Sequence, residues 1–315
     1  MKKYISFLLL TSLLLSGCTV QTQQTGEPAR VRVVATTYPV YLFLSAVAQG
    51  VDGVEIQRLD TGSTSCLHDY TLSVSDMKKL ETADVIAMNG AGLEEFMEDA
   101  LKTSKATVID CSQGVTLLEN RSHYHEGAAE EHDHGHYDPH YWLDPRNAQI
   151  MVQNLQEKLT EIDSENKELY EQNRLLTLAR LESCDSAARD CFAGAPVEIS
   201  GLITFHDGFQ YFCHAYDLPL LEAIEEEAGS EASAQEIQEI TQLVEEQKIP
   251  VVFTEVNGSD STARAIQRET GCQVAQLTMM MDGPDGELDQ YWNGIMGNVA
   301  AVVNGFAGEE VVVVK

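Results

Sequence analysis

The chain has 315 residues, of which 43% are hydrophobic, and its 50 acidic residues against 20 basic ones give a formal net charge of −30. This length exceeds what one small core needs and is typical of two domains. The acidic balance argues against nucleic acid as a partner and favours the attraction of cations, although plain solubility explains it equally well.

The N-terminus has the pattern of an export signal. Two lysines precede an apolar run, residues 4–15, which is shorter than the ~20 residues that span a bilayer. The run ends in Leu-Ser-Gly-Cys, residues 15–18, which resembles a lipobox. We therefore expect a signal peptide over 1–17, acylation of Cys18 and a polar tether over 18–30. An ordinary secreted protein with a chance cysteine is the alternative.

These features place the protein outside the cell. We expect it on the outer leaflet of the cytoplasmic membrane, held by lipid and not by a transmembrane helix. No later segment is long and apolar enough to span.

After the tether, strands alternate with helices in two series. Strands are predicted at 31–35, 54–59, 85–89 and 107–110 in the first series, with helices at 40–49, 73–81, 93–104 and 146–162. The second series has strands at 198–204, 218–223, 251–254 and 274–277, and helices at 208–216, 233–247, 262–270 and 290–306.

Between the two series lies one long helical stretch, residues 166–192, without internal glycine or proline. At 1.5 Å per residue it would be about 40 Å long, which suits a strut between domains. The predicted fold is therefore α/β, with an N-terminal lobe over 31–165 and a C-terminal lobe over 193–315. Each lobe is expected to contain a mostly parallel sheet flanked by helices.

A histidine-rich segment, residues 121–137, interrupts the first lobe. It contains five of the nine histidines, mixed with acids and glycine, and no core can be built from it. A mobile surface loop that holds metal loosely is one interpretation, and a chance low-complexity insertion is the other. The five are His123, His125, His132, His134 and His136.

Four histidines lie outside that loop. His206 follows an apolar strand, where ligands of open α/β sheets bind, and His140 lies in a proline-flanked Asp-Pro-His-Tyr-Trp-Leu-Asp-Pro motif. His68 follows a Gly/Ser/Thr loop, whereas His214 falls inside a helix and is more readily structural. A cleft between the lobes would bring the first three together, although each alone is more often a satisfied core or surface residue.

The chain resembles a known family at several motifs. These are 36–40, 75–80 after His68, 83–94, 138–145, 206–211, 253–255 and 269–271, and the Asp-Pro-His-x-Trp-Leu-Asp-Pro motif is the most specific. The family is the zinc-type metal-receptor branch, cluster A-I, of the solute-binding lipoproteins of bacterial ABC transporters. The resemblance implies two α/β lobes joined by one rigid helix, with His68, His140 and His206 holding a metal in the cleft.

The fourth metal ligand departs from the family pattern, which has an Asp or Glu near the end of the last strand. Met279 or Met280 falls at that position, and Asp282 would reach it only with a shifted loop. We therefore expect water or a nearby carboxylate in the fourth place.

Three imidazoles suit tetrahedral Zn²⁺, whereas Mn²⁺ prefers oxygen ligands and methionine favours Cu(I). The predicted function is that of a monomeric, non-enzymatic receptor that delivers Zn²⁺ to an ABC-transporter permease and its ATPase. A manganese receptor of the same class is the alternative. A zinc hydrolase is more remote, because no His-Glu-x-x-His helix or general base is identifiable. A surface adhesin is the third alternative.

Six cysteines follow the lipobox, and outside the cell they are able to pair. We expect Cys213 with Cys272 and Cys66 with Cys111, each near the ends of neighbouring elements. Free buried thiols are an equally weighted alternative.

Overall fold

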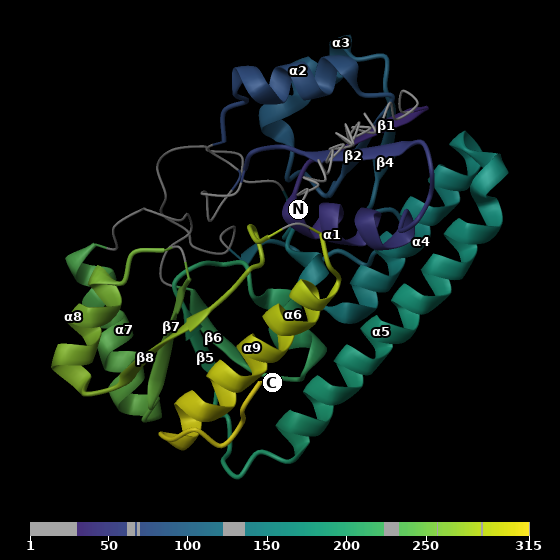
Figure 1. Ribbon diagram of the computed structural model, residues 1–315. Coiled ribbons are helices and arrows are strands. Elements are labelled where there is room, and N and C mark those ends of the chain that lie inside the picture. The colour runs from purple at the N-terminus through teal and green to yellow at the C-terminus, as the bar shows by residue number, and fades with distance from the viewer. Residues whose placement is uncertain are drawn as a thin grey trace, which may run out of the picture.

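Two four-stranded parallel sheets organise the chain in a computed structural model that describes residues 30–61, 67, 70–121, 136–223, 233–256, 258–284 and 286–314. The first sheet has the order β2-β1-β3-β4 and the second the order β6-β5-β7-β8. Helices flank both sheets, and one long helix, α5, runs along both lobes (Figure 1). The predicted fold class is therefore confirmed.

The elements of the N-terminal lobe are the following. Its strands are β1 (Val31–Ala35), β2 (Val54–Arg58), β3 (Val85–Met88) and β4 (Thr107–Asp110), and its helices are α1 (Tyr38–Val47), α2 (Val74–Thr82), α3 (Glu98–Thr103) and α4 (Pro145–Ile162). Short 3₁₀ turns lie at Glu95–Met97, Tyr141–Leu143 and Ser164–Asn166.

The C-terminal lobe repeats this plan. Its strands are β5 (Leu202–Thr204), β6 (Leu220–Ala223), β7 (Val251–Glu255) and β8 (Gln273–Leu277), and its helices are α6 (Gln210–Ala215), α7 (Ala234–Gln247), α8 (Ser261–Thr270) and α9 (Asp289–Ala307). Between the lobes α5 covers Lys167–Ala193.

Several predicted elements differ from the structure by one or two residues at their ends, and two differ more. The strand predicted from residue 198 begins only at Leu202, after Gly201, whose φ of 154° strongly favours glycine. The helix predicted over 93–104 is a 3₁₀ turn followed by a short α-helix, because Met97 leaves helical geometry at φ −116° and ψ 10°. Neither difference changes the order of the elements.

Side-chain alternation along the strands gives each sheet two apolar faces. In β1, Val33 and Ala35 face α1 and α4, whereas Val34 packs with Leu80 and Ile86 in a separate cluster beneath α2 and α3. The outer face of the second sheet likewise has its own cluster with α7 and α8. The faces turned toward α5 belong to one cluster that runs through both lobes.

The helix α5 shares this continuous core. Its buried residues recur every three to four positions, so one face packs against α4, α1 and α9. The Asn173 amide donates to the carbonyls of Val47 and Gln49 in the first lobe, at 2.9 and 2.8 Å. A shared core and a single straight strut both restrict how far the lobes separate.

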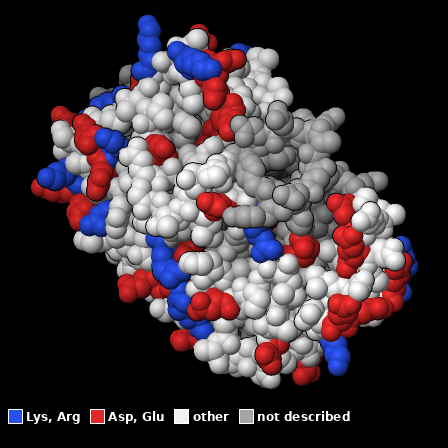
Figure 2. Space-filling view, turned by 180° about the vertical axis from the view of Figure 1, so that it is seen from behind, with Lys and Arg blue, Asp and Glu red and all other residues white. Residues whose placement is uncertain are grey.

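Charged side chains of both signs are interspersed over the face shown in Figure 2. Within the described ranges no helix is both long and apolar enough to cross a membrane.

Candidate metal site at the junction of the lobes

His140 is held by a carboxylate two residues before it. Asp138 Oδ1 accepts from the His140 backbone N–H at 2.9 Å and lies 2.7 Å from the ring Nδ1. Since a carboxylate only accepts, this contact places the ring proton on Nδ1 and turns the Nε2 lone pair toward a metal. Both residues are buried, at 4% exposure for His140 and 1% for Asp138.

The backbone around His140 is fixed from both lobes. The Asn89 amide, at the end of β3, donates to the Pro139 carbonyl at 3.0 Å, and the Tyr141 hydroxyl donates to the Asn89 carbonyl. From the other lobe, the Tyr211 hydroxyl of α6 donates to the Asp138 carbonyl at 3.0 Å. The position of His140 is therefore set before any ligand arrives.

His206 lies at the carboxyl end of β5. The Phe205 N–H donates to the Phe253 carbonyl at 2.9 Å, which continues the pairing with β7 just past the strand. His206 is 3% exposed, and its Nδ1 lies 3.9 Å from Glu255 Oε1 at the end of β7. The edge of the sheet thus places an imidazole and a carboxylate side by side.

The two imidazoles come from different lobes and meet at their junction. Their ring centroids are 5.2 Å apart with an interplanar angle of 85°. The ring centroid of Trp142 lies 5.3 Å from that of His140. Among the described residues, no group of three or more His, Cys, Asp or Glu side chains is arranged to hold a metal. The structure thus shows two of the three predicted ligands together.

The third predicted ligand, His68, lies outside the described residues, as do His123, His125, His132, His134 and Cys18. His136 is described. Its exposed ring has Nε2 4.0 Å from Glu119 Oε1 and lies against Tyr137. Residues 118–120 and 136–138 pair as antiparallel backbone, so the ends of the histidine-rich segment close directly beside Asp138.

Asp207 adds a second acid near Asp138. Burial, followed by the negative charge of Asp138, raises the pKa of the Asp207 carboxyl to about 6, while Arg121 and His140 act in the opposite direction. Oδ1 of Asp207 and Oδ2 of Asp138 are buried without a hydrogen-bond partner among the described residues. Negative charge therefore gathers behind the imidazoles, which favours a bound cation.

Asp282, the weaker candidate for the fourth ligand, is 45% exposed. Its Oδ1 lies 3.3 Å from a guanidinium nitrogen of Arg58, and the same nitrogen donates to the Gly283 carbonyl at 3.0 Å. Arg58 also lies 4.9 Å above the Tyr38 ring, and the Tyr38 hydroxyl donates to the Pro284 carbonyl at 2.8 Å. These contacts join the loop after β8 to the N-terminal lobe.

The predicted disulfide between Cys213 and Cys272 is wrong. Both thiols are free and buried, and they belong to separate apolar clusters, Cys213 to the inner core and Cys272 to the cluster under α7 and α8. Cys111 is also free and buried, so its predicted bond to Cys66, which lies outside the described residues, is not formed either.

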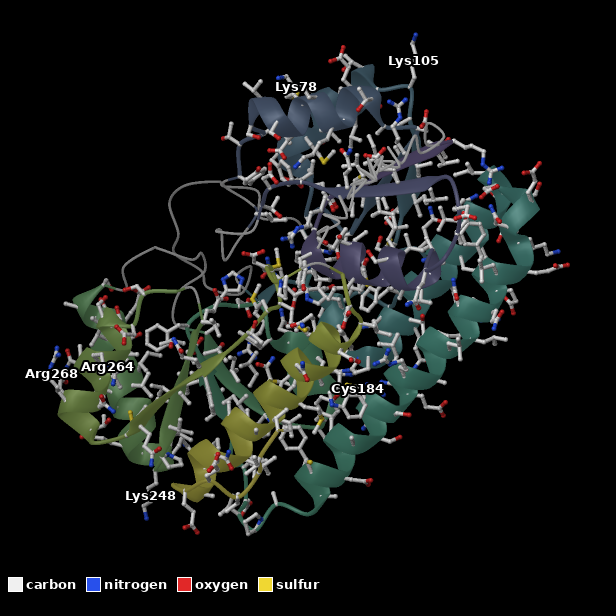
Figure 3. The ribbon with its side chains drawn as sticks, in the orientation of Figure 1. Lys78, Lys105, Cys184, Lys248, Arg264 and Arg268 are labelled. Carbon is white, nitrogen blue, oxygen red and sulfur yellow. The ribbon has the colours of Figure 1, made fainter. Side chains whose placement is uncertain are left out.

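Four of the five described thiols are buried, and none belongs to a group of three or more described side chains that could hold a metal. Burial raises the pKa of Cys184 to about 12 and that of Cys213 to about 12, so both stay protonated at neutral pH. Figure 3 shows Cys184 on the side of α5 that faces α9, whereas the labelled lysines and arginines point outward.

One residue near His206, Glu255, was not predicted as a site residue from the sequence. Glu255 was noted only as part of a motif that resembles the family. An acid at the end of β7 was a usable signal, because β7 pairs with β5, the strand that precedes His206. Met279, in contrast, was expected, with Met280 as the alternative, at the position of the family's fourth ligand. Gly208 leaves space for it, because a β-carbon there would stand 2.7 Å from Met279 Sδ and 3.1 Å from His206 Nε2.

Comparison with known proteins identifies the family of the chain. The family model for zinc-uptake complex component A, periplasmic, matches residues 33–305. The iron-binding protein YfeA of Yersinia pestis is 27% identical over 301 residues, covering 94% of this chain and 93% of its own. The manganese ABC transporter substrate-binding lipoprotein PsaA of Streptococcus mitis is 27% identical over 316 residues, covering 95% and 97%.

Solved structures share the fold. The laminin-binding protein of Streptococcus agalactiae, described as a bifunctional protein with adhesin and metal transporting activity, superimposes with a TM-score of 0.75. The match covers 88% of this chain and 99% of that one, at 23% identity.

The family match defines a solute receptor that binds a metal ion, not an enzyme. The chain belongs to the family of the periplasmic component A of zinc-uptake complexes. It is the metal-binding, substrate-binding protein of an ABC transporter, which works with a permease and an ATPase. Its relatives are named for different metals, so membership of the family does not fix the metal.

Proposed function

We propose that the protein captures Zn²⁺ outside the cell and delivers it to its permease, with His68, His140 and His206 as ligands. The observation that carries this proposal is the meeting of two buried imidazoles from different lobes, 5.2 Å apart between ring centroids. Asp138 orients one of them with Nε2 free to coordinate. Neutral imidazoles suit Zn²⁺ well.

Manganese is the second candidate, because PsaA is named for it. Mn²⁺ prefers carboxylate and carbonyl oxygens in larger numbers. The side chains around the two imidazoles do not favour it, since the Glu255 carboxylate lies on the Nδ1 side of His206 and Asp138 is engaged with the His140 ring. The donor set therefore supports zinc.

Transport requires release as well as capture. A metal drives closure only if it binds the closed arrangement more tightly than the open one. The continuous core through both lobes and α5 supports a small motion, in which the lobes move around a fixed junction. We place the N-terminal lobe at 31–165, the connecting helix at 166–192 and the C-terminal lobe at 193–315.

The remaining parts of the proposal concern the membrane and the histidine-rich loop. Lipid on Cys18 would hold a monomer at the outer leaflet, and the tether over 18–30 would give it reach. The loop over 121–137 would gather Zn²⁺, and its paired ends adjoin Asp138, which supports a role in capture. Deleting residues 123–136 should slow capture at low zinc and leave the tight site intact.

Elemental analysis of protein purified without added metal, followed by a calorimetric competition of zinc against manganese, tests the metal. We expect one tightly bound zinc per chain and displacement of manganese by zinc. Tight manganese binding that zinc fails to displace would contradict the assignment.

A further inference from the structure

The position of Met279 is fixed by its backbone. Its carbonyl accepts from the Trp142 indole N–H at 2.9 Å, across the lobe junction. Just before it, the Thr278 N–H donates to Asn298 Oδ1 and the Thr278 carbonyl accepts from Asn298 Nδ2, both at 2.8 Å. These bonds tie the loop after β8 to α9 on one side and to the residue two positions after His140 on the other.

The Met279 side chain lies close to the His206 imidazole. Its sulfur and His206 Nε2 lie 2.7 and 3.1 Å from the same point, the place that a side chain at residue 208 would occupy. Residue 208 is a glycine, so both groups share that space. The side chain is buried, at 4% exposure, in the core that runs through both lobes.

The neighbouring candidates are directed elsewhere. Met280 adopts a φ of 56°, and its sulfur packs over Gly294 of α9, where a β-carbon would stand only 2.3 Å away. Asp282 pairs with Arg58, and the Glu255 carboxylate lies 3.9 Å from Nδ1 of His206. Of the groups in this loop, the Met279 thioether is the donor beside Nε2.

We propose that Met279 supplies a neutral thioether ligand on the fourth side of the metal site and thereby makes the site discriminate against manganese. This inference rests on the proposed function. Thioether sulfur is a soft donor. It therefore stabilises borderline and soft metal ions and stabilises a hard ion such as Mn²⁺ only weakly. A thioether is also uncharged. Unlike a carboxylate, it therefore does not offset the free-energy cost of removing a hard divalent ion from water.

Two substitutions test the role of Met279. Met279→Leu removes the sulfur at nearly constant volume, and we expect zinc affinity to fall about tenfold while manganese affinity stays unchanged. Met279→Glu supplies a hard donor at the same place, and we expect manganese affinity to rise at least tenfold. Met281→Leu is the matched control, since Met281 is equally buried in the same loop, and it should leave both affinities unchanged.

X-ray absorption at the zinc edge gives an independent readout. The zinc complexes of the original protein and of the Met281→Leu variant should show sulfur bonded to zinc, and the Met279→Leu complex should show only nitrogen and oxygen. Histidine-dependent zinc binding without a sulfur ligand would overturn this inference and leave the proposed function standing. Zinc binding that does not depend on the histidines would overturn both.

Discussion

The two sheets have the same strand order, and their carboxyl edges correspond residue by residue. The Thr36 N–H past β1 bonds to the Ala87 carbonyl of β3 at 3.0 Å, as the Phe205 N–H past β5 bonds to the Phe253 carbonyl of β7 at 2.9 Å. By this correspondence Thr37 occupies the place of His206. The same backbone geometry therefore presents a hydroxyl in one lobe and an imidazole in the other.

The two edges use their polar groups differently. Thr37 caps α1 by accepting from the Val40 N–H at 3.4 Å. Beside it, the buried Glu94 carboxylate accepts from the Thr36 hydroxyl at 2.6 Å and from the backbone N–H groups of Asn89 and Gly90 at 2.7 and 2.9 Å. The N-terminal edge thus holds its own loops together, and the C-terminal edge presents a buried imidazole.

The shared topology of the two sheets therefore determines the position of a residue at the sheet edge. It does not determine whether that residue stabilises a loop or faces the lobe junction. The N-terminal lobe contributes the proposed ligand His140 from the segment that Asn89 anchors and not from a strand end. Changes at the two edges should therefore separate metal binding from stability.

The largest effect is expected from His206→Ala. Loss of one of three imidazoles should reduce zinc affinity at least 100-fold, which is about 2.7 kcal/mol, while the metal-free protein keeps most of its stability. Isothermal titration calorimetry and thermal unfolding of the metal-free protein measure the two quantities. His214→Ala is the control, because that histidine is exposed on α6. Equal zinc affinities in the two variants would contradict the role of His206.

Glu94→Ala should show the opposite pattern. The substitution removes the carboxylate that accepts from two buried N–H groups, of which that of Asn89 keeps only the longer bond to the Thr36 hydroxyl, and should lower the free energy of unfolding by about 2–4 kcal/mol. Zinc affinity measured well below the melting temperature should change less than tenfold. Denaturant unfolding measures the loss, with the exposed neighbour Glu95→Ala as control. If Glu94→Ala abolished zinc binding in a stably folded protein, the comparison of the two edges would be wrong.

The charge state of Glu94 adds a pH dependence to that comparison. Burial is the largest influence and raises the pKa of the Glu94 carboxyl to about 7, against the lowering effect of its three hydrogen bonds. A carboxyl whose pKa is raised on folding stabilises the fold below its unfolded pKa, and this contribution is lost as pH rises toward 7. The stability of the original protein relative to the Glu94→Gln variant should therefore fall as pH rises from 4.5 to 7. A difference that stays constant over this range would refute the raised pKa.

A smaller effect is expected from Asp138→Asn. The amide oxygen is a weaker acceptor for the His140 ring N–H, so the ring is held less firmly and zinc affinity should fall about tenfold. Asp282→Asn is the matched control, because that carboxylate pairs with Arg58 and should affect zinc affinity little. A larger loss from Asp282→Asn than from Asp138→Asn would show that Asp282 coordinates the metal.

Much of this architecture was predictable from the sequence because it rests on local patterns. Apolar alternation predicted the strands, and serines at 73 and 233 indicated the starts of α2 and α7, where the structure shows capping boxes. The placement of His140 and His206 followed from a proline-flanked motif and a strand end. The resemblance to a family implied that these two histidines lie together at one site.

What the sequence did not predict depends on contacts between distant segments. Met279 lies close to the His206 ring for two reasons. Gly208 has no side chain between them, and the Trp142 indole N–H holds the Met279 carbonyl. The disulfide prediction was wrong because nearness in the order of elements does not show which face of the sheet a thiol occupies. Cys213 and Cys272 lie in different apolar clusters.

The central claim is that imidazoles from both lobes bind one zinc ion at their junction. A crystal structure of the zinc-loaded protein, with anomalous data at the zinc edge, tests it most directly. We expect one dominant peak within about 2.0–2.1 Å of Nε2 of both His140 and His206, with His68 completing the set. A dominant peak that lies within the histidine-rich loop, or that contacts only one of the two described histidines, would contradict the account.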